Sequence, residues 1–183
     1  MDTAEALNWA EEILKPFSSL STRVAPDRLD VNLMMIRLEP AVRAFVDQKW
    51  GHLSAITGLD HPGSTFARPE EKQWSRLAGE TEDLSSGASR EGMIEILYHF
   101  CRKAAIVTLR INVRYSFPIL PSICPILPAA TLYERELMEM FGVQVVGTPN
   151  KDRLLLPDDW PDGVYPLRKT FKGLRAAQLE EGE

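Results

Sequence analysis

Two runs of alternating apolar residues, separated by only two positions, constrain this chain more than any other feature of its sequence. The runs are Met93–Cys101 and Ala104–Val113, and Arg102-Lys103 stands between them. Alternation with a period of two is typical of strands with one buried face, and so short a connection favours an antiparallel hairpin. The turn lacks the glycine or asparagine that hairpin turns favour, so its limits stay open. The chain is therefore expected to fold around a sheet.

Further strands and helices are expected on both sides of this hairpin. Asp30–Leu38 and His52–Leu59 have the composition of strands. Glu39-Pro40 opens a helix between them, because proline fits the first turn of a helix. After the hairpin, a proline-rich connection leads to a helix at Ala129–Phe141. Together these elements predict an α/β (α+β) fold, a mixed sheet flanked by helices, with an irregular C-terminal extension.

The N-terminal segment carries the signals of a helix. Asp2 stands at the capping position, Glu5 follows three residues later as its reciprocal partner, and Pro16 stops the helix. Apolar residues recur at helical spacing: Ala6, Leu7, Ala10, Ile13 and Leu14. We expect an amphipathic helix packed on the body of the protein. A membrane-surface helix is the alternative, and the acidic character of the segment disfavours it.

The chain is expected to divide into three parts. Residues 1–28 form the N-terminal helix and a linker, residues 29–171 the main domain, and residues 172–183 a polar, flexible tail. Residues 64–92 are rich in charge, and their apolar residues recur at neither helical nor strand spacing. We therefore expect a surface insertion in the main domain, with Trp74 attaching it to the body.

Composition excludes several classes of protein. A chain of 183 residues is long enough for one hydrophobic core. A net charge of −5, with the basic residues scattered, argues against a general nucleic-acid binder. Cys101 and Cys124 lack the number and spacing of a disulfide framework, a zinc site or an iron–sulfur site. The N-terminus lacks the features of a secretory signal, and no run of about 18 apolar residues occurs.

The predicted helix at 129–141 places charges beside an apolar stripe. The stripe consists of Tyr133, Leu137, Met140 and Phe141. Glu134 and Glu136 then lie on its opposite edges, whereas Arg135 and Glu139 share the outward face and are expected to pair with each other. The pattern fits a solvated rim or a contact surface for another protein. Carboxylates on opposite edges do not converge on one reacting atom, which disfavours acid–base catalysis by the two together.

A free-standing enzyme is the first alternative. Its general base would be Glu134, Glu136 or His99. However, His52, His61 and His99 show no spacing typical of metal ligands, so a structural role is favoured for each. The sequence also lacks a nucleophile elbow, a glycine-rich phosphate loop and a dinucleotide fingerprint.

Two more features leave alternatives open. The carboxylates of Asp158, Asp159 and Asp162 form a cluster that a cation could attract, but their proline-rich setting favours a capped turn. The second alternative function is a soluble adaptor that binds unrelated partners through the proline-rich run. That run contains Pro118, Pro121, Pro125 and Pro128.

Five short motifs follow one another in the second half of the chain. They are Glu134-Arg135-Glu136, Met140–Val143, Gly147–Pro149, Arg153–Pro157 and Pro166–Lys169. In this order and spacing they resemble the signature of the 30 kDa subunit family of respiratory complex I. That family includes equivalent subunits or domains of membrane-bound NiFe hydrogenases and formate hydrogenlyases. The resemblance is strongest over residues 129–171 and weaker back to Asp30.

The resemblance implies a non-catalytic subunit in the peripheral arm of a membrane-associated, ion-translocating oxidoreductase, on the cytoplasmic side of the membrane. It implies no cofactor bound by this chain: iron–sulfur clusters and a NiFe or quinone site would belong to partner subunits. The implied partners are a large subunit (49 kDa-like or NiFe hydrogenase large subunit), an iron–sulfur subunit and, indirectly, membrane subunits, in a hetero-oligomer without nucleic acid. By matching position, the interface or architecture-holding residues would be Glu134, Arg135, Glu136, Pro166, Leu167, Arg168 and Lys169.

Two departures from the family pattern concern the parent complex. Respiratory members commonly have histidine where this chain has Thr148, between Gly147 and Pro149. The stretch Leu155–Pro161 is more similar to the hydrogenase-associated relatives. Both departures slightly favour a hydrogenase-type complex, with ferredoxin or formate as electron donor, over an NADH-type complex.

Overall fold

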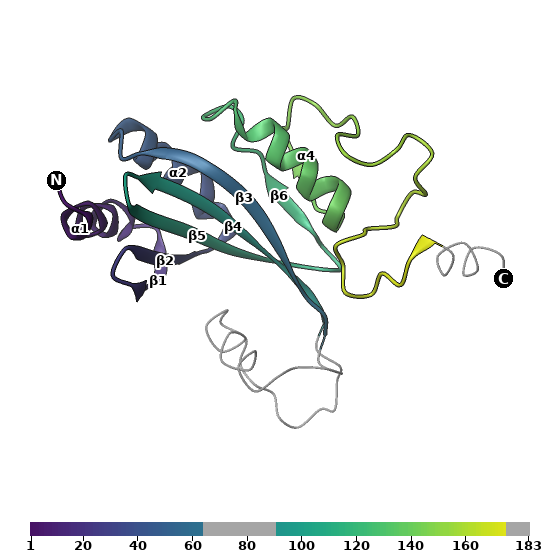
Figure 1. The fold of residues 1–183 in the computed structure, drawn as a ribbon, viewed down its shortest axis with the longest axis horizontal. Helices are drawn as coiled ribbons and strands as arrows, with labels where there is room; N and C mark the ends of the chain where they lie inside the picture. The colour runs from purple at the N-terminus through teal and green to yellow at the C-terminus, as the bar shows by residue number, and fades with distance from the viewer. Residues whose placement is uncertain (64–90, 175–183) are drawn as a thin grey trace, which may run out of the picture.

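The structure, a computed structural model, describes residues 1–63 and 91–174 (Figure 1). At its centre is a five-stranded sheet with the spatial order β1-β2-β5-β4-β3. The strands are β1 (Ser18–Ala25), β2 (Arg28–Leu33), β3 (His52–His61), β4 (Met93–Arg102) and β5 (Ala105–Arg114). β2 and β5 run parallel, and the other neighbours are antiparallel. The predicted hairpin is β4–β5, and the predicted mixed sheet is confirmed.

Within residues 1–63 and 91–174, three α-helices and a second sheet complete the architecture. The helices are α1 (Thr3–Leu14), α2 (Leu38–Asp47) and α4 (Ala130–Phe141), and a 3-10 turn, η1 (Met35–Arg37), precedes α2. The predicted capping box of α1 is present, because Asp2 and Glu5 each accept a hydrogen bond from the other's main-chain N–H. Two short parallel strands, β6 (Ile119–Pro121) and β7 (Gln144–Val146), precede and follow α4.

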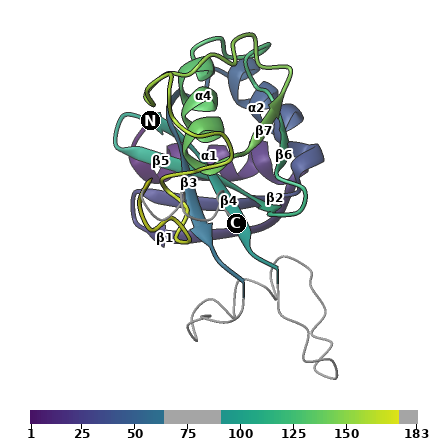
Figure 2. The same cartoon turned by 90° about the vertical axis from the view of Figure 1, so that its right-hand side faces the viewer.

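One face of the large sheet is apolar and carries the core. Val107 and Leu109 of β5 are buried, and the strand register puts them beside Phe100 and Tyr98 of β4. Phe45 of α2 meets Phe100 edge-on, with 5.2 Å between ring centroids. Figure 2 shows α2 and α4 on the same side of the sheet. The alternation that predicts these strands therefore also identifies the face that the helices cover.

The opposite face of the sheet carries a line of polar groups across four strands. Arg110 on β5 donates to Asp30 on β2 and to Glu95 on β4, at 2.7 Å each. Glu95 is also 3.1 Å from the ring of His61 on β3. His99 lies between threonine hydroxyls of both neighbouring strands, at 3.0 and 3.2 Å. The histidines of this face therefore hold strands together.

Several predicted boundaries are wrong. The strand predicted at Asp30–Leu38 ends at Leu33, because the chain turns into η1 and α2 there. Residues 1–28, expected as the N-terminal helix and a linker, also contain β1, a polar outer strand paired antiparallel with β2. The hairpin turn lies at Lys103-Ala104 instead of Arg102-Lys103, and Lys103 has a φ of +55° there.

Other predictions fall on residues that the structure does not describe. Nearly all of the expected insertion at 64–92, including Trp74, lies outside the described residues, and so does most of the tail at 172–183. The division into three parts therefore stays a prediction.

Candidate docking site

Glu134 lies inside the protein, not on a rim. Its side chain is 0% exposed. The carboxylate accepts hydrogen bonds from the Ser122 hydroxyl (2.8 Å), the Ile123 main-chain N–H (2.8 Å) and the Cys124 thiol (3.1 Å). These donors lie between β6 and α4, so Glu134 fixes that connection to the helix. The prediction of a solvated rim is wrong for Glu134, because three donors satisfy the carboxylate in the interior.

The surroundings of Glu134 also shape the electrostatics of the core. The Tyr98 hydroxyl is fully buried nearby. Burial and the negative charge of Glu134 raise the pKa of Tyr98 well above its ordinary value. This tyrosine therefore stays protonated in the physiological range.

Arg135 and Glu139 bind the main chain of the following irregular segment. Arg135 donates to the carbonyls of Asp152 (2.8 Å) and Arg153 (2.7 Å). The carboxylate of Glu139 accepts from the N–H groups of Leu154 and Leu155. The predicted pairing of these two side chains with each other is therefore wrong. Both charged side chains form hydrogen bonds with the main chain of a loop that has no regular structure. The N–H and C=O groups of this loop need such partners, because no helix or strand supplies them.

The motif Pro166–Lys169 docks on the C-terminal end of α4. The Leu167 N–H donates to the carbonyl of Met140 (3.2 Å), and the Arg168 guanidinium donates to that of Phe141 (2.8 Å). These carbonyls belong to the last turn of the helix, where intrahelical donors run out and a positive charge is favourable. The motif thereby closes the end of the helix.

Arg168 is further held by two aromatic rings. Its guanidinium carbon lies 4.8 Å from the ring centroid of Tyr115 and 4.6 Å from that of Tyr165. The Tyr115 hydroxyl donates in turn to Asp60, and burial and this bond raise the pKa of Tyr115. A cation between two rings is a specific, partly dehydrated arrangement. Arg168 therefore acts within the chain.

The remaining motif residues project outward. Leu167 is 52% exposed, the Lys169 side chain is exposed, and Glu136 is half-buried. Across residues 1–63 and 91–174, the Glu136 carboxylate makes no hydrogen bond or ion pair. Leu154 and Leu155, whose main chain Glu139 holds, are 36% and 59% exposed. We call this set, Glu136, Leu154, Leu155, Leu167 and Lys169, the α4 surface.

Residues of α4 hold both segments that carry the exposed leucines of the α4 surface. Glu136 precedes Glu139 and Met140 by one turn, and these two residues hold the Leu154–Leu155 segment and Leu167 respectively. The contribution of Leu154 and Leu155 escapes sequence reasoning, although both lie in a recognised motif. The signal in the sequence is a run of three leucines, Leu154–Leu156, in a stretch with no helical or strand period.

The acidic cluster of the C-terminal segment does not form a cation site. The Asp162 carboxylate accepts a hydrogen bond from the Arg153 guanidinium at 2.8 Å, and this bond closes a turn. Within the described ranges, no group of three histidine, cysteine or acidic residues could hold a metal ion. In the same part of the chain, no helix is long and apolar enough to cross a membrane.

Comparison with known proteins gives a family match. The profile of the family described as respiratory-chain NADH dehydrogenase, 30 Kd subunit, matches residues 33–176. The C subunit of the NADH-quinone oxidoreductase of Moorella thermoacetica is 36% identical over 182 residues, which cover 96% of this chain and 99% of that protein. Formate hydrogenlyase subunit 5 of Escherichia coli is 51% identical over 63 residues, 34% of this chain. The chain spans between 9% and 33% of the length of such hydrogenase relatives.

The fold is shared with a solved structure. A chain in the membrane-bound sulfane sulfur reductase, an archaeal respiratory membrane complex, superposes with a TM-score of 0.62 at 19% identity, over 98% of this chain and 92% of that one. At this identity the likeness concerns the fold alone. It covers the sheet, the helices and the C-terminal segment together.

Proposed function

This chain belongs to the 30 kDa subunit family of the respiratory-chain NADH dehydrogenase, and we propose that it is a non-catalytic subunit that docks on the large subunit of a membrane-associated oxidoreductase and stabilises it. The chain would sit in the peripheral arm, on the cytoplasmic side of the membrane. It would bind no cofactor itself. An iron–sulfur subunit and the large subunit, which houses a quinone or NiFe site, would be its partners in a hetero-oligomer.

One observation carries this proposal: charged side chains fix an irregular segment whose leucines face outward. Arg135 and Glu139 bind main-chain groups of residues 152–155, and Arg168 binds the Phe141 carbonyl at the end of α4. These contacts leave the side chains of Leu155 and Leu167 on the surface, where they are 59% and 52% exposed. Ordering a segment costs conformational entropy, and exposed leucines do not recover that cost in the isolated chain. Burial against another protein would recover it.

The charges of the α4 surface favour a partner of complementary pattern. Glu136 lies without an ion-pair partner among the described residues, and Lys169 is exposed. Groups of opposite sign around a dry apolar contact set orientation and specificity. Of the seven residues that the family resemblance singles out, Glu136, Leu167 and Lys169 would therefore touch the partner. Glu134, Arg135 and Arg168 would hold the architecture.

Two parent complexes remain within this proposal. Similarity along the whole chain is to an NADH-quinone oxidoreductase subunit. Identity is higher, 51%, over the shorter stretch shared with a formate hydrogenlyase subunit. The large subunit that purifies with the chain decides between them: two cysteine pairs that ligate nickel would identify a hydrogenase, and their absence would favour quinone chemistry.

Purification under non-denaturing conditions tests the proposal. The tagged full-length chain, at native abundance, should elute with a large subunit and an iron–sulfur protein. The chain released from them should show no redox or hydrolytic turnover. Elution of the chain alone, with turnover of a substrate, would instead support the free-standing enzyme.

A further inference from the structure

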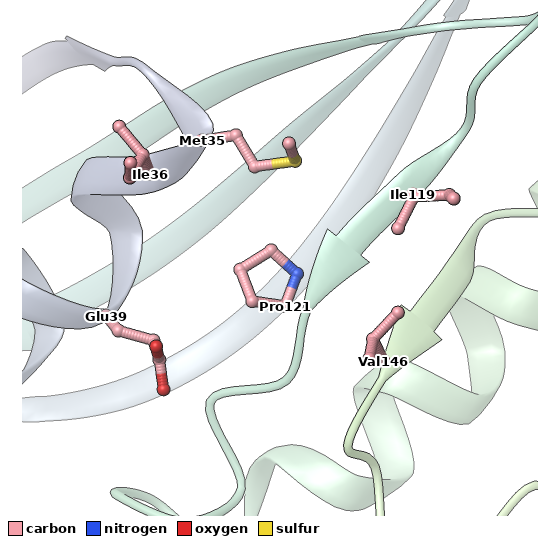
Figure 3. Close-up of a pocket in the computed structure, with 6 residues that line it drawn as sticks. All are labelled: Met35, Ile36, Glu39, Ile119, Pro121 and Val146. Carbon is pink, nitrogen blue, oxygen red and sulfur yellow. The ribbon is translucent and has the colours of Figure 1, made fainter.

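A second apolar surface lies apart from the α4 surface. It is a groove of about 380 Å³ between η1 and the start of α2 on one side and β6 and β7 on the other. Its lining residues are Met35, Ile36, Glu39, Ile119, Pro121 and Val146. Figure 3 shows these side chains around a shared open space, with η1 and α2 facing the two strands.

The floor of the groove is the outward face of the two-stranded sheet. Leu120 and Val145 are paired neighbours, buried at 0% and 2% exposure, and they point into the core. Ile119, Pro121 and Val146 alternate with them and therefore face outward, and Val146 is 60% exposed. An outward strand face is ordinarily polar. Here it is apolar at these three positions.

The wall of the groove is a run of exposed apolar residues. Met34, Met35 and Ile36 are consecutive and are 60%, 37% and 78% exposed. The first residue after this run whose side chain is buried in the core is Leu38 of α2. Three exposed apolar residues in a row do not serve folding, and such a patch marks an interaction site. Methionine side chains adapt their shape to an irregular partner.

We propose that this groove receives an apolar segment of a partner polypeptide, with a lysine or arginine beside the segment that pairs with Glu39. Glu39 is the single charged residue among the six that line the groove, and it is exposed. A basic residue opposite it would be attracted while the flanking aliphatic side chains fill the groove. The inference rests on the proposed function, because it presupposes a multisubunit complex, and it adds a second contact to that of the α4 surface.

The Glu39 charge also argues against a second copy of this chain as the occupant. In a symmetric pair, a second copy of this chain would bring its own Glu39 toward the first, and like charges repel. A partner segment with a basic residue satisfies both the apolar lining and the carboxylate.

Photo-cross-linking in the assembled complex tests the proposal. A benzophenone amino acid replaces Ile36 in the full-length chain, and the cross-linked peptide is identified by mass spectrometry. The expected product is one segment of a partner subunit that contains aliphatic residues and a nearby lysine or arginine. The same probe at Val24, which is 51% exposed on β1 and does not line the groove, should not give that product. Cross-links to a second copy, to lipid or to no polypeptide would overturn the proposal.

Charge substitutions give an independent measurement. Ile36→Glu and Val146→Glu place a carboxylate in the groove, and retention of the partner on gel filtration should fall by about tenfold or more, since a charge buried in an apolar contact is costly. Val24→Glu should retain the partner as the wild type does. Normal retention by both groove variants would overturn the inference while leaving the proposed function intact. A wild-type chain that elutes alone would overturn the proposed function itself.

Discussion

Asp60 and Lys169 lie 109 positions apart in the sequence, yet the Asp60 carboxylate accepts a hydrogen bond from the Lys169 main-chain N–H at 2.7 Å. The same carboxylate, 5% exposed, accepts from the Tyr115 hydroxyl. One acidic residue at the end of β3 thus fastens the Pro166–Lys169 motif to the sheet. The α4 surface depends on this connection, because it positions Leu167.

Replacing Asp60 should loosen the C-terminal segment. In Asp60→Ala, the Lys169 N–H and the Tyr115 hydroxyl lose their acceptor, and the free energy of unfolding should fall by about 1–3 kcal/mol. Urea denaturation measures the loss. Asp159→Ala, which removes an exposed carboxylate in the same segment, is the control and should stay near the wild type. Equal stability of the two variants would show that Asp60 does not fasten the motif.

Replacing Glu134 or Glu136 of α4 with glutamine should change the free energy of unfolding by different amounts. Glu134→Gln replaces an acceptor of three hydrogen bonds with an amide that cannot satisfy all three donors, so unfolding should become easier by about 1–3 kcal/mol. Glu136→Gln removes no hydrogen bond within the described parts of the chain and should leave stability unchanged. Thermal and chemical denaturation of both variants check this difference. Equal effects would contradict the assignment of Glu134 to the interior.

The position that caps the C-terminal end of α4 requires glycine. Gly142 has a φ of +69°, and a Cβ there would overlap the ring of Tyr165. Gly142→Ala should therefore cost about 2–4 kcal/mol, from left-handed backbone strain and from the clash. Gly163 has a φ of +77° with no atom within 4 Å of an added Cβ, so Gly163→Ala should cost only the strain, about 1 kcal/mol. A cost for Gly142→Ala no greater than that for Gly163→Ala would contradict this packing.

Because Glu95 lies on the polar face of the sheet, the free energy of unfolding should depend on pH in the acid range. Burial alone raises the pKa of Glu95, but hydrogen bonds from His61 and Arg110 outweigh it and hold the pKa below the ordinary value of 4.5. A carboxyl whose pKa is lower in the folded state stabilises the protein above its ordinary pKa, and this stabilisation is lost as the pH falls through the folded value. Glu95→Gln should thus be less stable than the wild type at pH 7, and the gap should shrink below pH 4.5.

Denaturation curves of Glu95→Gln and the wild type between neutral and acid pH measure that gap. Glu12→Gln, at an exposed position of α1, serves as the control. A gap that stays constant across the acid range would contradict a lowered Glu95 pKa.

Strong periodicity and turn chemistry explain which parts of the fold are predictable. The β4–β5 hairpin, β3, α2 and α4 follow from alternation, from proline at a helix start and from Gly142 at a helix end. β1 escapes prediction because its sequence is mostly polar, and an outer strand needs little apolar patterning. The parallel pairing of β2 with β5 is a long-range contact that no local signal encodes.

The candidate site shows the same limit at single residues. The sequence predicts an apolar stripe of Tyr133, Leu137, Met140 and Phe141 on α4. In the structure Tyr133 is only half-buried, and the buried face also includes Ala130 and Glu134. A buried glutamate cannot be told from a rim glutamate by helical position alone. What decides is the set of donors from Ser122 to Cys124, which only the fold brings together. The family resemblance points to the right motifs but does not separate inward from outward residues.

Docking through the α4 surface is measured by the amount of large subunit that elutes with Glu136→Lys. Co-elution should be lost, because reversing an interfacial charge weakens docking. The thermal midpoint of the isolated variant should stay that of the wild type. Glu12→Lys, the same change of charge at an exposed position of α1, should assemble normally. Wild-type assembly by Glu136→Lys would contradict docking through the α4 surface.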